Sequence, residues 1–335
     1  MRVALIGKHG HYYSAIQEAK DDKRLVFCGV APGVPGEDMS EISRMTEDEL
    51  GQSIRLFDTW GEMVESAKPD ICIVNTEFYM NAEISAKLLR QGIHVFAEKP
   101  SAINLAQLDD LVDAYAEGKA EYMSMFTYYY SPAYEKVHSL IKDGAIGRVR
   151  LINAQKSYRL GERPKFFGDL NKFGGTIPWV GSHAAQWAYQ MSQSAEFISA
   201  YAMSNNADNY GNGSLDMCAV MQFEMSDGIL FTANIDYLRP ACAPSHGDDR
   251  LRVVGTGGIV EIIGGDINII SPGLSGAISP DKPDTQIFKE FMRMTGGSPA
   301  RFSAKDCFKI TRAVLCAQLS AVTGEVVRIE KDVSY

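Results

Sequence analysis

The sequence predicts an α/β protein in which a doubly wound parallel sheet is followed by an α+β domain with a large open, mainly antiparallel sheet. The chain has 335 residues, a length that favours two domains. Strand-like and helix-like segments alternate up to about residue 100, whereas hairpin patterns follow one another in the second half. We therefore expect a first domain over residues 1–122 and a second over residues 123–335.

Alternating elements are the evidence for the first domain. Apolar runs predict strands at Val3–Ile6, Leu25–Ala31, Ser53–Phe57, Asp70–Asn75 and His94–Ala97, and helical spacing predicts helices over Tyr12–Ala19 and Ala82–Gln91. Gly92 suits the left-handed position that ends the second of these helices. Strands and helices in turn over short loops are typical of a parallel sheet with helices on both faces.

Hairpins are the evidence for the second domain. Ser226-Asp227-Gly228 joins Met217–Glu224 to the alternating strand Ile229–Tyr237, and Thr256-Gly257-Gly258 joins Arg250–Gly255 to Ile259–Ile263. A strand at Val149–Ala154 and helices at Pro132–Asp143, Gln286–Met294 and Asp306–Val322 complete the predicted elements. One face of such a sheet packs on helices and the other stays free. We therefore expect a homo-oligomer, a dimer or tetramer, formed through this sheet.

Composition narrows the class of protein. The net charge of −9 and the scattered lysines and arginines argue against a nucleic-acid partner. No apolar run reaches the ~18 residues of a membrane span, and the start of the chain lacks the pattern of a secretory signal. The six cysteines form no C-x-x-C pair, which favours reduced core residues over disulfides or zinc ligands. These features predict a cytoplasmic protein with no membrane partner.

A glycine-containing loop follows the first predicted strand. In Gly7-Lys8-His9-Gly10-His11-Tyr12, Gly7 fits the first position of the dinucleotide pattern G-x-G-x-x-G, and Gly10 can supply the close backbone approach to a pyrophosphate. His9 and Tyr12 occupy the other two glycine positions, so any tight strand-to-helix turn is an equal alternative. The second strand is followed by no acid before Glu37, which leaves NAD and NADP open. No cluster of carboxylates or cysteines accompanies His9 and His11 to complete a metal site, and we predict that the protein binds no metal.

Motifs along nearly the whole chain resemble one family of oxidoreductases. They are Val95-Phe96-Ala97-Glu98-Lys99-Pro100, Ser131-Pro132-Ala133, Gly144–Val149, Gly174-Gly175-Thr176 leading to Gly181-Ser182-His183, His246–Leu251, Gly255–Gly258 and Ser320–Glu325. In this order they are similar to the glucose–fructose oxidoreductase / inositol dehydrogenase / rhizopine-catabolism (Gfo/Idh/MocA) family. The resemblance implies a Rossmann domain that binds NAD or NADP, and hydride transfer between nicotinamide and a sugar, inositol or related polyol.

The resemblance also assigns site residues. Lys99 would supply a positive charge at the reacting oxygen, and His183 would act as the acid/base. The expected cofactor-binding residues are Gly7, His9, Gly10, His11, Tyr12, Asn75, Thr76, Glu98, Lys99 and Pro100, and the expected substrate-binding residues are Lys99, Tyr128, Tyr158, Arg159, Trp179 and His183. Some candidate residues also have a purely structural explanation. The run Tyr128–Tyr130 would then pack between the domains, Arg159 would lie in a solvated loop, and His246, Asp248 and Asp249 would shape a turn.

The chain departs from the usual pattern of this family at several positions. Trp179 and Gln186 stand where aspartates are frequent, Asn81 stands for a histidine, and Thr76-Glu77 replaces Thr-Pro. Trp179 could instead stack on a sugar ring or on nicotinamide. The departures motivate two alternatives to a dehydrogenase: an NAD-dependent glycoside hydrolase with no net redox change, and a non-catalytic ligand sensor on the same scaffold.

Overall fold

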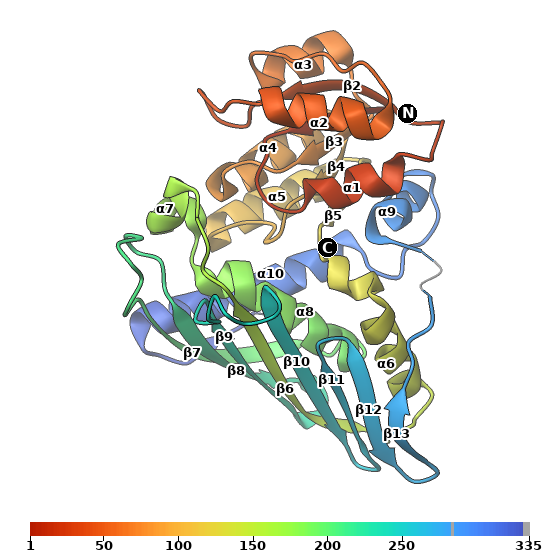
Figure 1. The fold of residues 1–335 in the computed structure, drawn as a ribbon, viewed down its shortest axis with the longest axis vertical. Coiled ribbons are helices and arrows are strands. Elements are labelled where there is room, and N and C mark those ends of the chain that lie inside the picture. Colours follow the sequence, from red (N-terminus) through yellow and green to blue (C-terminus); the bar gives the residue numbers. More distant parts are fainter. Residues whose placement is uncertain (283–284, 331–335) are drawn as a thin grey trace.

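The computed structural model describes residues 1–282 and 285–330 and contains two β-sheets, drawn one above the other in Figure 1. The first sheet has five strands in the order β2-β1-β3-β4-β5. These strands are β1 (Arg2–Ile6), β2 (Val26–Ala31), β3 (Ile71–Val74), β4 (His94–Ala97) and β5 (Tyr122–Ser124), and all neighbouring pairs are parallel. The predicted Rossmann sheet is confirmed. Its strand order reverses between β1 and β3, which is where such sheets bind ligands.

Helices connect the strands of the first sheet. They are α1 (Tyr12–Ala19), α2 (Ser40–Leu50), α3 (Trp60–Ala67), α4 (Phe78–Arg90) and α5 (Leu105–Glu117). The predicted bounds of α1 are confirmed, and α4 begins four residues earlier than predicted, at Phe78 rather than Ala82. Gly92 has φ +77°, the left-handed conformation expected after the end of α4.

The segment Ser53–Phe57 is not a strand, so that prediction is wrong. Only an isolated bridge joins Leu56 to Val30 at the edge of β2. The side chain of Gln52, not a backbone carbonyl, accepts a hydrogen bond from the N–H of Phe27 at 3.0 Å. Because this side chain satisfies part of the β2 edge, the segment runs beside the sheet without forming a ladder.

The second sheet has nine strands in the order β13-β12-β11-β10-β6-β9-β8-β7-β14. They are β6 (Val149–Tyr158), β7 (Phe197–Asn205), β8 (Cys218–Met225), β9 (Ile229–Asp236), β10 (Gly247–Gly255), β11 (Ile259–Ile263), β12 (Asp266–Ser271), β13 (Leu274–Ile278) and β14 (Val327–Arg328). Both predicted hairpins are present as β8–β9 and β10–β11. The sheet is mainly antiparallel as predicted, with one parallel pair, β6 and β9, at its centre.

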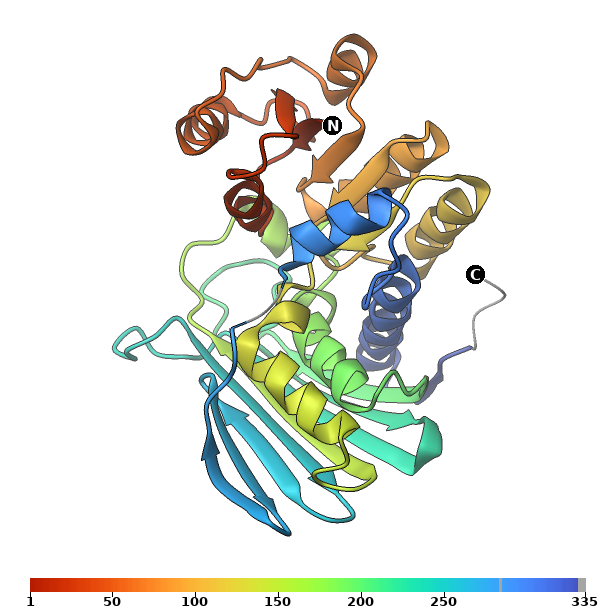
Figure 2. The same cartoon turned by 90° about the vertical axis from the view of Figure 1, so that its right-hand side faces the viewer.

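Helices cover one face of the second sheet and leave the other bare (Figures 1 and 2). The covering helices are α6 (Pro132–Lys142), α8 (Ser182–Met191) and α10 (Ala304–Thr323). Short helical segments lie at Thr127–Tyr130, Lys165–Gly168, Leu170–Phe173 (α7), Ile177–Gly181 and Ser226–Gly228. Helix α9 (Ile287–Thr295) packs beside α1 and β4 of the first sheet, where Phe288 and Phe291 contact Phe96 (Figure 1). Among the described residues no helix is both long and apolar enough to cross a membrane.

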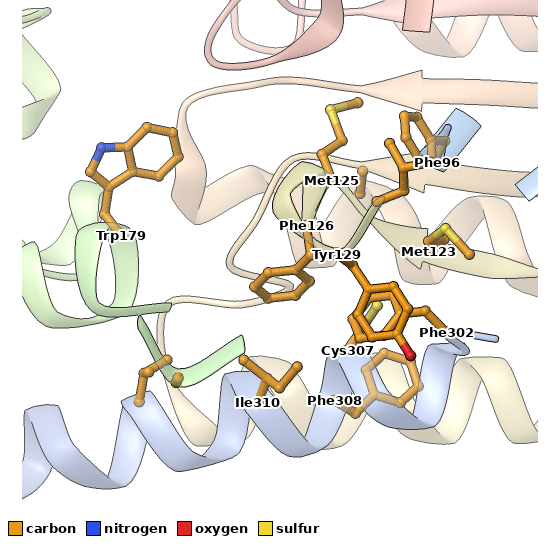
Figure 3. Packing of buried hydrophobic residues seen from close by; sticks show 14 of the residues in the cluster. Phe96, Met123, Met125, Phe126, Tyr129, Trp179, Phe302, Cys307, Phe308 and Ile310 are labelled. Carbon is orange, nitrogen blue, oxygen red and sulfur yellow. The ribbon is translucent and has the colours of Figure 1, made fainter. Parts of the chain in front are cut away.

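Aromatic side chains pack where the two halves meet. Tyr129 contacts Phe302 with ring centroids 4.6 Å apart, and Phe126 lies 5.8 Å from the same ring. Figure 3 shows these rings together above Cys307 and Phe308 of α10, with Trp179 standing apart from the cluster. Tyr129 therefore belongs to the junction between the halves, as the packing alternative for the run Tyr128–Tyr130 expected.

Candidate active site

The loop after β1 packs closely against the ends of β3 and β4. Gly7 and Gly10 have φ +78° and +92°. A Cβ on Gly7 would lie 2.4 Å from the carbonyl oxygen of Asn75, and one on Gly10 would lie 2.0 Å from Oε2 of Glu98. Glycine is therefore required at both positions by conformation and by space, although the G-x-G-x-x-G pattern is incomplete.

Glu98 fixes the far end of this loop. Its carboxylate is fully buried and accepts from the backbone N–H of His11, from the N–H of Lys99 at 2.9 Å and from Nδ2 of Asn75 at 3.2 Å. The Nδ1 atom of His11 lies 2.9 Å from Oε1 of the same carboxylate. These contacts bring together the predicted residues His11, Asn75, Glu98 and Lys99 at the carboxyl edge of the sheet.

The start of α1 suits an anionic group. His11, the residue that precedes the helix, makes no side-chain capping hydrogen bond, and the first turn contains no acidic residue. The N–H of His11 donates to Glu98 and that of Ser14 to the carbonyl oxygen of His11, which leaves the N–H groups of Tyr12 and Tyr13 without a partner among the described residues, beside the positive end of the helix dipole. This arrangement at the switch point fits the pyrophosphate of a dinucleotide.

The carboxylate of Glu37 lies near the end of β2, although the sequence shows no acidic residue directly after this strand. The loop after β2 folds back, so that the Glu37 carboxylate accepts from the N–H of Gly33 at 2.7 Å and lies 3.2 Å from Nε2 of His9. Burial opposes ionisation, but these two donors hold the pKa of Glu37 below its usual range. A charged carboxylate at this place suits the hydroxyls of an adenosine ribose.

Lys99 is a buried ammonium with no carboxylate in contact among the described residues. It is 1% exposed, donates from Nζ to the carbonyl oxygen of Trp179 at 2.5 Å and lies 3.4 Å from the centroid of the Trp179 ring. Burial lowers the pKa of Lys99 to about 7; Glu98 opposes this shift, and the charges of Lys156 and Arg163 reinforce it. The Lys99–Pro100 peptide bond is cis.

His183 is a buried imidazole whose ring nitrogens are both free. It is 1% exposed, and neither Nδ1 nor Nε2 has a hydrogen-bond partner in the described part of the chain. Burial, followed by the charges of Lys99, Lys156 and His11, lowers the pKa of His183 well below its usual range. The ring is therefore neutral at pH 7. A neutral ring with a free nitrogen can accept a proton.

A short π-helical turn, Ile177–Gly181, runs into α8 and connects Trp179 to His183. Its carbonyl oxygen at Trp179 accepts from the hydroxyl of Ser182 at 2.9 Å as well as from Lys99. The Trp179 ring stacks on Phe78 at 4.4 Å. Such turns are frequent at functional sites because they displace one residue from the helix surface.

Lys156 lies at the same site but is paired. On β6 it stands opposite Asp249 of β10, with Nζ 2.5 Å from Oδ2 of that carboxylate and 2.7 Å from the hydroxyl of Tyr128. Tyr128 also donates to Asp249 at 2.5 Å, and its ring lies 5.1 Å from that of His183. The Tyr128 ring thus lies beside His183, and Asp249 on β10 holds Tyr128 and Lys156 together.

A cavity of about 320 Å³ opens between the glycine loop and the end of β6. It is lined by His9, Gly10, His11, Phe78, Tyr158, Arg163, Pro164, Phe167, Trp179 and His246. His9, Gly10, His11, Tyr158 and Trp179 were predicted site residues; Phe78 and Phe167 were not. A hydrophobic residue at the start of a helix, such as Phe78, gives no sequence signal that separates it from the core.

Other predicted residues lie beside the cavity rather than on its wall. Thr76 donates from Oγ1 to Oδ1 of Asn81 at 2.9 Å, and its methyl group would meet a Cβ on Gly33. Arg159 donates to the carbonyl oxygen of Ala243, and Tyr12 is half-buried at the start of α1. Within the described ranges no group of three or more His, Cys, Asp or Glu side chains is arranged to hold a metal, and the absence of a metal remains a prediction.

Fold and site together define a two-domain oxidoreductase with an NAD-binding domain. Residues 2–126 match the oxidoreductase family with an NAD-binding Rossmann fold, and residues 134–261 match the Gfo/Idh/MocA C-terminal domain. The chain belongs to the Gfo/Idh/MocA family.

Several known proteins are similar to this chain. A structure of a putative oxidoreductase from Thermotoga maritima is 35% identical with a TM-score of 0.93, over 98% of this chain and 100% of that one. A levoglucosan dehydrogenase in complex with NADH and levoglucosan is 16% identical with a TM-score of 0.81, over 99% and 100% of the two chains, which shows the fold alone.

Curated relatives match over shorter regions. An inositol 2-dehydrogenase/D-chiro-inositol 3-dehydrogenase from Lactiplantibacillus plantarum is 24% identical over 132 residues, 39% of this chain and 35% of that protein. The regions matched in the first relatives cover 22% and 40% of their own length. The similarity therefore establishes the family and the type of cofactor domain.

Proposed function

We propose that this protein is a cytoplasmic NAD-dependent dehydrogenase or reductase that acts on a hydroxyl or carbonyl group of a sugar, inositol or related polyol. The observation that carries the proposal is that Lys99, just beyond the carboxyl end of β4, and His183 of α8 are both buried, with no carboxylate on the Lys99 ammonium and no hydrogen-bond partner on the His183 ring among the described residues. Related proteins named levoglucosan dehydrogenase and inositol dehydrogenase support the substrate class.

The cofactor, His183 and Lys99 have separate roles in the proposed reaction. The dinucleotide, when bound, supplies a nicotinamide ring that exchanges a hydride with the substrate carbon. In the oxidation direction, neutral His183 accepts the proton of the substrate hydroxyl through a free ring nitrogen. Lys99 has three N–H donors, of which one reaches Trp179, so another can donate to the substrate oxygen and stabilise its negative charge.

Replacing His183 tests this assignment. His183→Gln removes the proton acceptor, and we expect kcat/KM to fall about 10²–10⁴-fold in a reduced-nicotinamide absorbance assay with a panel of polyols. His138→Gln on α6 is the matched control and should retain turnover. If His183→Gln turns over as fast as the native protein, His183 has no acid/base role. Cleavage of chromogenic glycosides without net change in NADH would instead favour the hydrolase alternative.

We also propose that NAD is preferred over NADP. The Glu37 carboxylate near the end of β2 would repel the 2′-phosphate of NADP. In calorimetric titrations we expect NADH to bind about tenfold or more tightly than NADPH. Glu37→Gln should bring the affinities for NADH and NADPH closer together, and Glu41→Gln, at an exposed position, should leave their ratio unchanged. Equal affinities in the native protein would contradict this assignment.

The bare face of the second sheet supports the proposed homo-oligomer. Exposed apolar side chains on it include Met203, Leu230 and Ile270, which are 53%, 56% and 60% exposed. Apolar residues on a free sheet face commonly pack against a partner. Light scattering should give the mass of a dimer or tetramer, and Leu230→Glu should lower it; a native monomer would reject the proposal.

A further inference from the structure

The cavity beside Lys99 and His183 is lined by basic and aromatic side chains. Its wall contains Arg163, His246, His9 and His11, and among its described lining residues none is an aspartate or glutamate. The carboxylates nearby already have partners. Glu98 is held by His11 and by backbone N–H groups, and Asp249 is held by Lys156 and Tyr128. Of the basic side chains on the wall, His9 and His11 lie 3.2 and 2.9 Å from the carboxylates of Glu37 and Glu98, so among the described lining residues Arg163 is the permanently charged side chain without a carboxylate partner.

Arg163 is the cation best placed to meet a ligand. Its guanidinium carbon lies 4.8 Å from the centroid of the Tyr237 ring and 5.7 Å from that of Phe167. One terminal nitrogen donates to the carbonyl oxygen of Arg159 at 3.2 Å, while Nε is buried without a partner. No ion pair with a carboxylate occurs for Arg163 among the described residues. A partly desolvated guanidinium with free donors is a binding group for a planar or tetrahedral anion.

The charge of Arg163 also acts on neighbouring basic groups. His246, another lining residue, has a pKa below its usual range because of burial and then because of Arg163, Arg159 and Lys156. Arg163 also contributes to the lowered pKa of Lys99. The Arg163 guanidinium therefore keeps its positive charge at the cavity wall with no carboxylate in contact among the described residues, and a neutral sugar would leave that charge uncompensated.

We infer that the substrate is a sugar or polyol bearing an anionic group, a carboxylate or a phosphate, which Arg163 binds at the cavity wall. This inference rests on the function proposed above, and it assigns Arg163 as the residue that determines specificity. The anion pairs with the Arg163 guanidinium, and the rings of Tyr158 and Trp179 line the same cavity. The guanidinium fork distinguishes the acid from the neutral compound of the same stereochemistry.

Matched pairs of compounds test the inference. The NADH- or NAD-loaded protein is assayed for turnover and, by calorimetry, for binding with D-glucuronate and D-glucose, D-galacturonate and D-galactose, D-gluconate and D-glucitol, and glucose 6-phosphate. We expect at least one acid to have a KM or Kd about tenfold or more below that of its neutral counterpart. A larger preference for glucose 6-phosphate would identify phosphate as the anion, and a preference for the sugar acids would identify carboxylate.

Variants connect any preference to Arg163. Arg163→Gln should reduce the acid-to-neutral ratio about tenfold or more, and Arg163→Lys should restore part of it because the charge returns without the fork. Lys165→Gln removes an exposed charge two positions away and is the matched control. Neutral compounds used as well as the acids, or a ratio unchanged in Arg163→Gln, would overturn the inference and leave the proposed dehydrogenase intact. If no compound of either class binds or is turned over by protein that binds NADH, both proposals fail.

Discussion

Two lysines lie equally buried at this site, and only one has a carboxylate partner. Lys99 and Lys156 are each 1% exposed. Lys156 lies 2.5 Å from Asp249, whereas Lys99 donates to a backbone carbonyl and rests against the face of Trp179. Burial lowers the pKa of Lys156 to about 8 against the opposing charge of Asp249, and lowers that of Lys99 to about 7.

The contrast shows how the same side chain serves two purposes. Asp249 and Tyr128 hold the Lys156 ammonium in one position between β6 and β10, so this lysine joins two strands of the large sheet. Lys99 has no such partner, and its N–H donors are available to a ligand at the edge of the parallel sheet. We therefore assign chemistry to Lys99 and a structural role to Lys156.

Replacing Lys99 should give the largest effect on activity. Lys99→Met keeps the volume of the side chain but removes the donor and the charge at the reacting oxygen. We expect kcat/KM to fall on the order of 10³-fold, about 4 kcal/mol, while the free energy of unfolding does not fall, because an unpaired buried charge is lost. Steady-state turnover and urea denaturation check both parts. Full turnover combined with a clear loss of stability would show that Lys99 has a structural role instead.

Replacing Lys156 should show the reverse pattern. Lys156→Met leaves the Asp249 carboxylate beside Tyr128 without its cation, and we expect a loss of about 3 kcal/mol in the free energy of unfolding. The double variant Lys156→Met/Asp249→Leu should recover much of that loss, since no unpaired charge remains. Urea denaturation of the three proteins measures the effect. A single variant as stable as the native protein would show that the pair contributes nothing.

Much of the fold could be predicted because its signals are local. The alternation of Phe231, Ala233 and Ile235 with polar residues places them on the buried face of β9, and helical spacing defines α1. The prediction of a strand at Ser53–Phe57 failed for a tertiary reason, because a segment forms a strand only where a neighbouring strand has free backbone N–H and C=O groups to pair with it.

The site was only partly predictable. Motifs pointed to Lys99 and His183, and the two-residue period of β6 could have shown that Lys156 shares the inward face with Ile152 and Ala154. No local pattern reveals that Asp249 stands opposite Lys156, because the register of β6 and β10 joins distant segments. The depressed pKa of His183 likewise follows from burial beside cations that only the folded chain brings together.

The pH dependence of stability should separate the two lysines further. Both have a pKa below the unfolded value of about 10.4, so between the two values the unfolded chain binds more protons and stability rises with pH. For Lys99 the rise begins near pH 7, and for Lys156 near pH 8. Denaturation at pH 6 to 10 should show the native protein gaining on the order of 4 kcal/mol relative to Lys99→Met over this window. A constant difference in the free energy of unfolding between the two proteins would mean that the pKa of Lys99 is not lowered in the folded state.

The smallest predicted effect concerns the aromatic face under Lys99. Trp179→Phe keeps a ring against Phe78 but offers the ammonium a weaker negative face, so the charged form of Lys99 becomes less favourable. We expect the basic limb of the pH profile of kcat/KM to move to lower pH by roughly half a unit. Trp187→Phe is the matched control, because the Trp187 ring lies 5.4 Å from Nζ of Lys156, not beside Lys99. A shift in the control and none in Trp179→Phe would reverse the assignment, making Lys156 the lysine whose charge governs turnover.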